Sequence, residues 1–389
     1  MDYGKYLTNE ILAHWNEVEK LDTVFGGVFT DYDPDGKVAG TDKDIWYQGR
    51  EIWTYAMTYR LVEQRPEYLQ LCECAYQFLK KCTAPDGRLP YIVTRDGSPK
   101  VAREVYYSEM FAAMGCAQYY RVCLREDVWE LAMLYFSCLY ELYKKNRTTT
   151  QVIDGEPARK CLGLHMAMLA TVQFLRNVGR NTELFDEAAG MILHEMMSNG
   201  FVDEANGQVR EFVALYEEEL PPHLKNESIP GHIYEAAWFV LCEGELKNDD
   251  AIRLFGKKLL DHAMPAGFEN TTTLIPTHLD LSKSVQDNLA VDQFIDWPQE
   301  EAVIAYRVAY SIFGEERYLA LSKRIEETAF SYFADREARR WYNYVSRADG
   351  TVRERKKKGP HIAGTFHLER MLLALNILEK TGSILPYLA

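Results

Sequence analysis

Residues 68–97 read YLQLCECAYQFLKKCTAPDGRLPYIVTRDG, and residues 318–350 read YLALSKRIEETAFSYFADREARRWYNYVSRADG. Both stretches begin with Tyr-Leu-x-Leu, continue as an amphipathic helix, break, pass through a short aromatic β-like segment and close on Asp-Gly. A shortened relative, FGGVFTDYDPDG, occupies residues 25–36. Because Asp-Gly between short β-like segments is typical of a hairpin turn, the repeated unit is predicted to be helix, small hairpin, helix.

Amphipathic helices are predicted along most of the remaining chain. Five clear segments are residues 67–81, 126–144, 300–313, 316–332 and 366–380. Repeated helix pairs either close into a toroid or extend as a solenoid, and roughly a dozen helices fit this length. No linker rich in Pro, Gly or Ser divides the chain. We therefore expect one all-α domain over residues 1–389, an (α/α)6 barrel of antiparallel helix pairs with small β-hairpins in the connecting loops. An open helical solenoid is the alternative.

Composition narrows the class of protein. The formal net charge is −14, which argues against a nucleic-acid binder. Eight cysteines lack the spacing of a zinc site, so they are expected to be free thiols in a reducing compartment. The N-terminus has no signal-peptide pattern, and no apolar run is long enough to span a membrane, so a cytoplasmic protein is expected. The common nucleotide-binding, hydrolase and metalloprotease motifs are absent, which argues against those classes of protein.

Charged residues recur in aromatic helices that follow the predicted hairpins. Arg50 lies in IWYQGREIWTYAM (45–57) between Trp46 and Trp53, Glu109 lies in EVYYSEMFAAMG (104–115), and His367 lies in GPHIAGTFHLERMLLAL (359–375). A charge among aromatic side chains is costly unless it is paired or functional. Each alone could be structural: a snorkelling arginine, a salt-bridged glutamate or a core histidine. Their recurrence indicates a shared lumen.

The densest polar cluster is IPGHIYEAAWF, residues 229–239, in which His232 and Glu235 lie one turn apart on one helix face. Imidazole accepts or delivers a proton near neutrality, and a carboxylate at this spacing can orient it or hold a substrate hydroxyl. A metal site is a weaker alternative, since the ligand order is reversed from the known bundle motif and no second copy exists. His165, in CLGLHMAML (161–169), fits either a core or a lumen position.

Two further stretches leave alternatives open. IDWPQEEAVIAY (295–306) begins a helix in which Glu300 and Glu301 either favour the helix N-terminus or reach the lumen. The basic run RERKKK (353–358) is expected to be a solvated loop face, with a lid over the substrate as the alternative.

Several segments, in order, resemble the N-acylglucosamine 2-epimerase family, and more distantly the cellobiose 2-epimerases and aldose–ketose isomerases. They are WYQGREIWTYA (46–56), RDGSPKVAREVYYSEMF (95–111), PGHIYEAAWF (230–239), WPQEEAVIAY (297–306) and KGPHIAGTFHLER (358–370). The resemblance covers nearly the whole length. It departs at Asp296, where closer relatives carry a second Trp, and at Gln299, where they carry His; both residues are expected to border the sugar pocket.

The resemblance implies an (α/α)6 barrel, often a homodimer, without a metal or a redox cofactor; some members are activated by ATP. It assigns His232 and His367 as the acid–base pair and Arg50 and Glu235 as the groups that bind and polarise the open-chain sugar. Further substrate-binding positions are expected at Trp46, Glu109, His165, Trp297 and Glu301.

The predicted reaction is interconversion of N-acetylglucosamine and N-acetylmannosamine by ring opening and two-histidine proton transfer at C2. The alternative is an aldose–ketose isomerase, or an epimerase acting on mannose, glucose or a disaccharide such as cellobiose. A glycoside hydrolase could use Glu109, Glu235 and Glu301, but it would leave the histidines without a purpose. A non-catalytic binding protein would not need the full polar set.

Overall fold

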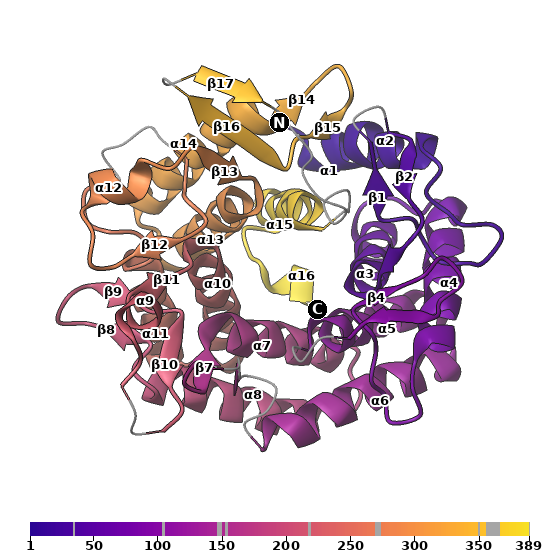
Figure 1. Ribbon diagram of the computed structural model, residues 1–389, viewed down its shortest axis with the longest axis horizontal. Coiled ribbons are helices and arrows are strands. Elements are labelled where there is room, and N and C mark those ends of the chain that lie inside the picture. Colours follow the sequence, from indigo (N-terminus) through magenta and orange to yellow (C-terminus); the bar gives the residue numbers. More distant parts are fainter. Residues whose placement is uncertain are drawn as a thin grey trace.

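The computed structural model describes residues 1–388 except 34–35, 103–105, 146–149, 152–154, 217–218, 269–273, 349–350 and 355–365. Its helices form two concentric rings (Figure 1). The inner ring consists of α3 (Ile45–Leu61), α5 (Tyr107–Cys123), α7 (Leu162–Arg176), α10 (Pro230–Lys247), α13 (Trp297–Phe313) and α15 (His367–Thr381). The outer ring contains α4 (Pro66–Cys82), α6 (Glu126–Tyr143), α8 (Thr182–Ser198), α11 (Asp250–Asp261) and α14 (Glu316–Phe333). The five helix segments expected from apolar spacing are all present.

The inner ring is closed. Each inner helix contacts the next along the chain, and α15 returns to contact α3. The outer partner of α15 comes from the other end of the chain, where α1 (Tyr3–Tyr6) and the π-helical turn η1 (Leu7–Ile11), followed by α2 (Leu12–Glu17), pack against it. The (α/α)6 barrel is therefore confirmed, and the open solenoid is wrong.

Small antiparallel sheets occupy the connections that lead from an outer helix into the next inner helix. In the described chain their strand orders are β1 (Asp31–Tyr32)–β2 (Val38–Gly40); β3 (Lys43–Asp44)–β4 (Ile92–Val93)–β5 (Pro99–Val101); β6 (Thr150–Gln151)–β7 (Arg159–Cys161)–β10 (Phe212–Ala214); β8 (Val202–Asp203)–β9 (Gln208–Val209); β11 (Glu227–Ser228)–β12 (Leu279–Asp280); β13 (Gln293–Ile295)–β16 (Tyr344–Ala348)–β17 (Thr351–Glu354); and β14 (Ala334–Asp335)–β15 (Arg340–Trp341).

The predicted hairpins are confirmed. β4 and β5 pair around Asp96-Gly97, and β1 pairs with β2. β16 pairs with β17, although the Asp349-Gly350 turn itself lies outside the described residues, as does most of the basic run 353–358. The recurring unit of helix, hairpin and helix follows from the sequence echo.

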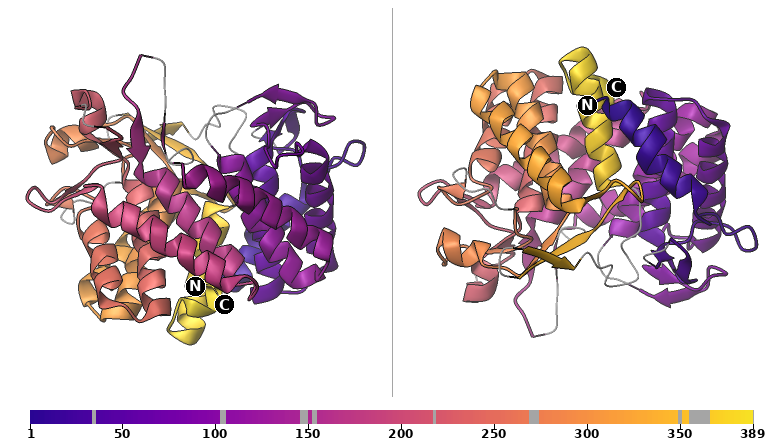
Figure 2. Two further views of the ribbon diagram at one scale, coloured as in Figure 1. Left: turned by 90° about the horizontal axis from the view of Figure 1, so that it is seen from below. Right: turned by 90° about the horizontal axis from the view of Figure 1, so that it is seen from above.

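The two ends of the barrel differ because the two kinds of connection differ. The turns from inner to outer helices are short, and left-handed residues such as Asn248 and Gly314 cap the helices there. The long, hairpin-bearing connections enter the N-termini of the inner helices, so all hairpins gather at one end, while both chain termini lie at the other (Figure 2). None of the described helices is long and apolar enough to cross a membrane.

The far end of the lumen is closed by the C-terminal segment. The short helix α16 (Leu385–Leu388) lies across the centre of the ring in Figure 1. The fully buried Tyr387 ring makes edge contacts with Trp53, Phe174 and Trp238 on three inner helices. Aromatic pairs of this kind add to the stability gained by burial. The lumen therefore has an aromatic floor, and the inner-helix N-termini surround the end opposite that floor.

Candidate active site

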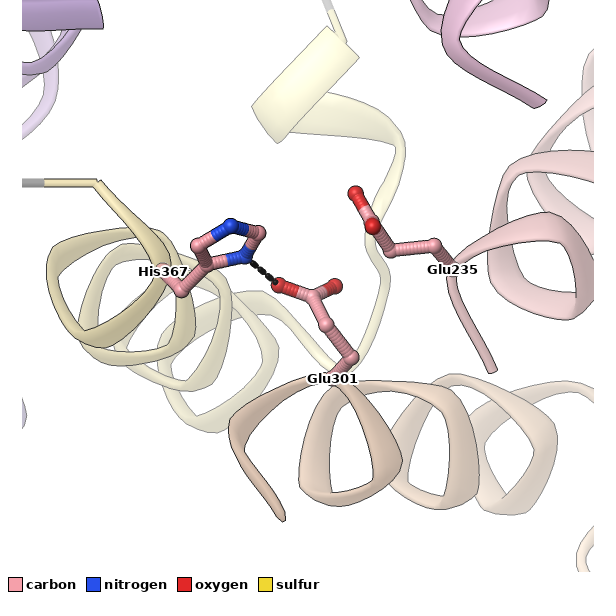
Figure 3. Close-up of side chains that lie close together, drawn as sticks. All are labelled: Glu235, Glu301 and His367. Carbon is pink, nitrogen blue, oxygen red and sulfur yellow. Dashed lines mark hydrogen bonds and ion pairs between the residues drawn. The ribbon is translucent and has the colours of Figure 1, made fainter. Parts of the chain in front are cut away.

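His367 begins α15 and is held by a buried charge network. Its Nδ1 lies 2.8 Å from Oε1 of Glu301 on α13. Arg370, one turn further along α15, donates to the same oxygen at 2.6 Å and also to Oε1 of Glu235 on α10. Trp238 donates to the second oxygen of Glu301 at 3.0 Å. Three inner helices are thus joined beside one imidazole, as Figure 3 shows for His367, Glu301 and Glu235.

This environment favours the neutral form of His367. Burial, the charge of Arg370 and the charge of Arg50 together hold the pKa of His367 well below its ordinary value. Burial also raises the pKa of the Glu301 carboxyl, although Arg370 opposes that shift. With Nδ1 donating to Glu301, the tautomer assigned from these contacts leaves Nε2 with a free lone pair, which suits a general base.

His232, in the first turn of α10, has a different partner. Its Nδ1 lies 3.1 Å from Oε2 of Glu211, which lies between β9 and β10. The other oxygen of Glu211 accepts the backbone N–H of Gly163 at 3.1 Å. A Cβ atom at Gly163 would lie only 2.5 Å from Nδ1 of His232, so glycine is required for this close approach. Burial alone would lower the pKa of His232, but the carboxylates of Glu211 and Glu235 outweigh it and the pKa is raised.

Trp297 contacts both histidines. Its ring centroid is 5.5 Å from that of His232 and 5.5 Å from that of His367, with tilts of 36° and 37°. Twice 5.5 Å, or 11 Å, is therefore the largest separation that the two imidazole centroids can have. The indole packs onto Gly231, where a Cβ would meet it at 2.1 Å. Both histidines retain partial exposure, 22% for His232 and 17% for His367, so each remains accessible to a small molecule.

Arg50, on α3, lies in an aromatic box. Its guanidinium carbon is 4.2 Å from the ring centroid of Phe111, 4.6 Å from Phe366, 5.1 Å from Trp46 and 5.5 Å from Tyr47. Burial lowers the pKa of Arg50, and its Nε has no hydrogen-bond partner among the described residues. A buried cation that is stabilised mainly by ring faces retains donors for an oxygen-rich ligand.

The carboxylates could be considered as metal ligands. Ligand atoms of Glu235, Glu301 and His367 lie within 4.8 Å of one another. The guanidinium of Arg370 already lies among them, however, and donates to both carboxylates; their two charges together hold its pKa above the ordinary value, against the effect of burial. The positive charge that balances this cluster is therefore supplied by the protein.

Two predicted substrate-binding residues lie apart from this group. Glu109 accepts from Arg88 at 2.7 Å and from the backbone N–H of Leu89 at 2.9 Å, so it anchors the loop before α5. His165 is fully buried, and its Nδ1 lies 3.0 Å from the hydroxyl of Tyr143 on the outer helix α6. Burial lowers the pKa of His165 to about 3. Both sets of contacts match the structural alternatives that the sequence left open, and neither residue contacts the histidine pair in the described structure.

The acidic and amide residues at the start of α13 lie in different environments. Glu301, not Glu300, joins the lumen network; Glu300 is buried, and neither of its oxygens has a partner among the described residues. Gln299 does not border the pocket as expected, because its amide binds both backbone groups of Ile275 and is fully buried. Asp296 caps α13 and accepts from Asn343, and burial raises its pKa to about 7.

Two residues that the sequence did not single out complete the site. Arg370 ends the segment KGPHIAGTFHLER, which carries the family resemblance, but it was given no role there; its other signal was a charged residue in a largely apolar helix. Glu211 is the one acidic residue in VREFVAL, residues 209–215. Neither assignment could be made without knowing which elements meet in space.

Comparisons with known proteins agree with this geometry. The family model of N-acylglucosamine 2-epimerase (GlcNAc 2-epimerase) matches residues 27–365. The N-acylglucosamine 2-epimerase of Bos taurus is 28% identical, covering 98% of this chain and 91% of the relative. The solved cellobiose 2-epimerase of Bacillus thermoamylovorans B4167 has a TM-score of 0.80 at 20% identity, covering 97% of this chain and 98% of that one. A solved D-mannose isomerase has a TM-score of 0.77 at 15% identity, covering 97% and 98%.

Proposed function

We propose, from the premise that this chain belongs to the N-acylglucosamine 2-epimerase family, that it is a sugar 2-epimerase interconverting N-acetylglucosamine and N-acetylmannosamine. The observation that carries the proposal is the pair of histidines, His232 and His367, which both contact Trp297 and begin two helices of the inner ring. Each imidazole is backed by a carboxylate. Epimerisation needs two groups that can exchange a proton with one carbon from opposite faces, and two imidazoles at this spacing are suited to that role.

The chemistry proceeds on the open-chain sugar, because the C2 proton is acidic only beside a carbonyl. One imidazole takes that proton, the C–H electron pair moves into the C1–C2 bond, and the carbonyl electrons move to O1 as an enolate. Arg50 is suited to stabilise this oxygen, since a preorganised buried cation acts strongly away from water. The other imidazole then donates its proton to the opposite face of C2: the C1=C2 electron pair forms the new C–H bond, and the electrons on O1 re-form the carbonyl. Every proton and electron pair is accounted for without a metal or a redox cofactor.

Substrate turnover in D₂O, followed by proton NMR, tests the proposal. N-acetylmannosamine is expected to give N-acetylglucosamine with solvent deuterium at C2, while mannose and cellobiose are offered as the alternative substrates. A ketose product would favour the aldose–ketose isomerase. His232→Ala and His367→Ala are each expected to lower turnover by about 10²–10⁴-fold, the usual contribution of an acid–base group. His194→Ala, on the outer helix α8, is the matched control, and wild-type turnover in either lumen variant would refute the mechanism.

Three finer points are part of the proposal. A cytoplasmic location is supported by the eight cysteines, none of which forms a disulfide bond in the described chain. A homodimer is expected from the family resemblance and is checked by light scattering of the purified protein. Activation by ATP has the same basis, and is checked by adding the nucleotide to the turnover assay.

A further inference from the structure

Each acid–base histidine has its own carboxylate, but the two carboxylates are in different electrostatic situations. Glu301 serves His367 while it also accepts two bonds from Arg370, at 2.6 and 3.1 Å, and one from Trp238. Its negative charge is therefore balanced before the histidine is considered. The same guanidinium lies 3.2 Å from Nδ1 of His367, where it opposes a second positive charge.

Glu211 has no such cation. Among the described residues its carboxylate contacts only His232 and the backbone N–H of Gly163. It is 2% exposed, so water does little to screen its charge. A buried carboxylate with one imidazole as its charged partner favours the imidazolium strongly. The negative charge on Glu211 is thus available to His232 in a way that the charge on Glu301 is not available to His367.

Glu211 is also fixed in position. Its backbone N–H donates to the carbonyl of Glu227, and its carbonyl accepts from the N–H of Leu162 at the start of α7. With the side chain also bound to Gly163, the residue is held at three points by two neighbouring segments. The imidazole of His232 lies closely against Gly163, and its Nδ1 is bound to Glu211. Rotation of the ring is therefore restricted, and Nε2 is the nitrogen left to face the lumen.

From these contacts we propose that Glu211 is the positioning residue of His232, holding it as an imidazolium whose Nε2–H is the acid of the resting enzyme, while His367 is the base. This inference rests on the proposed function and deepens it by assigning the resting proton. The other charged groups that act on His232 are Glu235 on its own helix, which is paired with Arg370, and His367 across the lumen. Glu211 is the one that touches the ring.

Glu211→Gln tests the assignment because the amide keeps the acceptor for Gly163 and loses the charge. The amide N–H₂ then faces Nδ1 of His232, which must accept, so the imidazolium is no longer stabilised. We expect kcat/KM to fall about 100-fold, the lower part of the acid–base range, with KM changed less than threefold. The alkaline limb of the kcat/KM profile, which reports the acid, should move to lower pH by at least one unit. Glu211→Asp, which keeps the charge, should restore the position of that limb.

A matched control separates this role from a structural one. Glu243, also on α10, is fully buried and accepts from Arg176 and Gln173, far along the helix from His232. Glu243→Gln should lower stability and leave the limbs of the profile in place. If both variants lose activity without any movement of the alkaline limb, Glu211 is a structural residue and the proposal is overturned.

A measurement that needs no turnover distinguishes this inference from the proposed reaction. Imidazole nitrogen shifts of ¹⁵N-histidine-labelled protein, with His232 assigned from the His232→Ala spectrum, follow the protonation of the ring directly. The ring should titrate at a lower pH in Glu211→Gln than in the wild type, and an unchanged titration would overturn the proposal. If no sugar is epimerised at all, the proposed function fails, while the titration still decides the role of Glu211.

Discussion

Replacing Arg370 by methionine would remove the one guanidinium that links two buried carboxylates. Arg370 is 1% exposed, and its partners Glu235 and Glu301 are 8% and 0% exposed at their side chains. Breaking a buried ion pair by removing one partner typically costs about 3–5 kcal/mol, because it leaves an uncompensated buried charge. At about 2.1 cal/mol/K per residue, unfolding of this chain has an entropy near 0.8 kcal/mol/K, so Tm should fall by about 4–6 °C.

The loss should depend on pH in a defined direction. Burial already raises the folded-state pKa of Glu301 above the unfolded value, and removing Arg370 removes the charge that opposes this shift. The folded variant then binds more protons than the unfolded chain between those values, so its stability falls as pH rises through that window. Relative to wild type, Arg370→Met should therefore be less destabilised at pH 5.5 than at pH 8.

Calorimetry at the two pH values measures the effect, and turnover per folded molecule separates stability from chemistry. Arg176→Met is the control, since Arg176 is paired with the fully buried Glu243 away from the lumen. It should show a similar loss of Tm and unchanged turnover, whereas Arg370→Met should lose both. An equal destabilisation of Arg370→Met at pH 5.5 and pH 8 would refute the reasoning, because the two carboxylates would then not depend on the guanidinium.

Two further predictions follow from single contacts. Gly163→Ala places a Cβ 2.5 Å from Nδ1 of His232, so the ring must move about 1 Å to reach ordinary contact; turnover should fall about 10²-fold with the circular dichroism spectrum unchanged, and wild-type turnover would show that the ring position is not critical. His165, whose pKa is lowered to about 3 by burial, is neutral when folded and charges on unfolding below its ordinary pKa of about 6.5, so stability should fall by about 1.4 kcal/mol per pH unit from there toward pH 3. Urea unfolding at pH 7 and pH 5 should show about 2 kcal/mol less pH dependence in His165→Phe, and identical slopes would place the titration elsewhere.

Most of the fold could be predicted from the sequence because its signals are local. Apolar spacing gave the helices, and the echo between residues 68–97 and 318–350 gave the unit that repeats. Closure of the ring could not be predicted in this way, because it depends on a long-range contact. It depends on the N-terminal turns of residues 3–17 docking against α15, which lies at the opposite end of the chain. Helix spacing carries no record of such a contact, so barrel and solenoid could not be separated before the structure.

In the site, too, pairs that are close in sequence could be predicted, and pairs that are distant in sequence could not. His232 and Glu235 are one turn apart on one helix, so the sequence places them together. Glu211 is 21 residues before His232 and reaches it only because β10 pairs with β7, which positions the start of α7 beside it. Conversely, His165 shares the inner helix α7 with lumen-facing neighbours, but its side chain turns toward Tyr143 on the outer ring. One residue on a helix that is buried on all sides can face either way, and apolar spacing does not distinguish the two directions.

The asymmetry between the two histidines has a consequence for repeated turnover. A resting enzyme with a proton on His232 and none on His367 finishes one epimerisation with the proton on His367 and none on His232. That arrangement is the unfavourable one, since it sets an imidazolium against Arg370 and leaves the Glu211 charge uncompensated. The charges of Arg370 and Glu211, which favour the starting protonation state, therefore also favour its return after each turnover. Both side chains keep about a fifth of their surface exposed, so solvent can take the proton from His367 and supply a new one to His232. Product should accordingly acquire deuterium at nearly every turnover in D₂O, because His232, which delivers the hydrogen to C2, is recharged from solvent, while the proton taken by His367 is released to solvent.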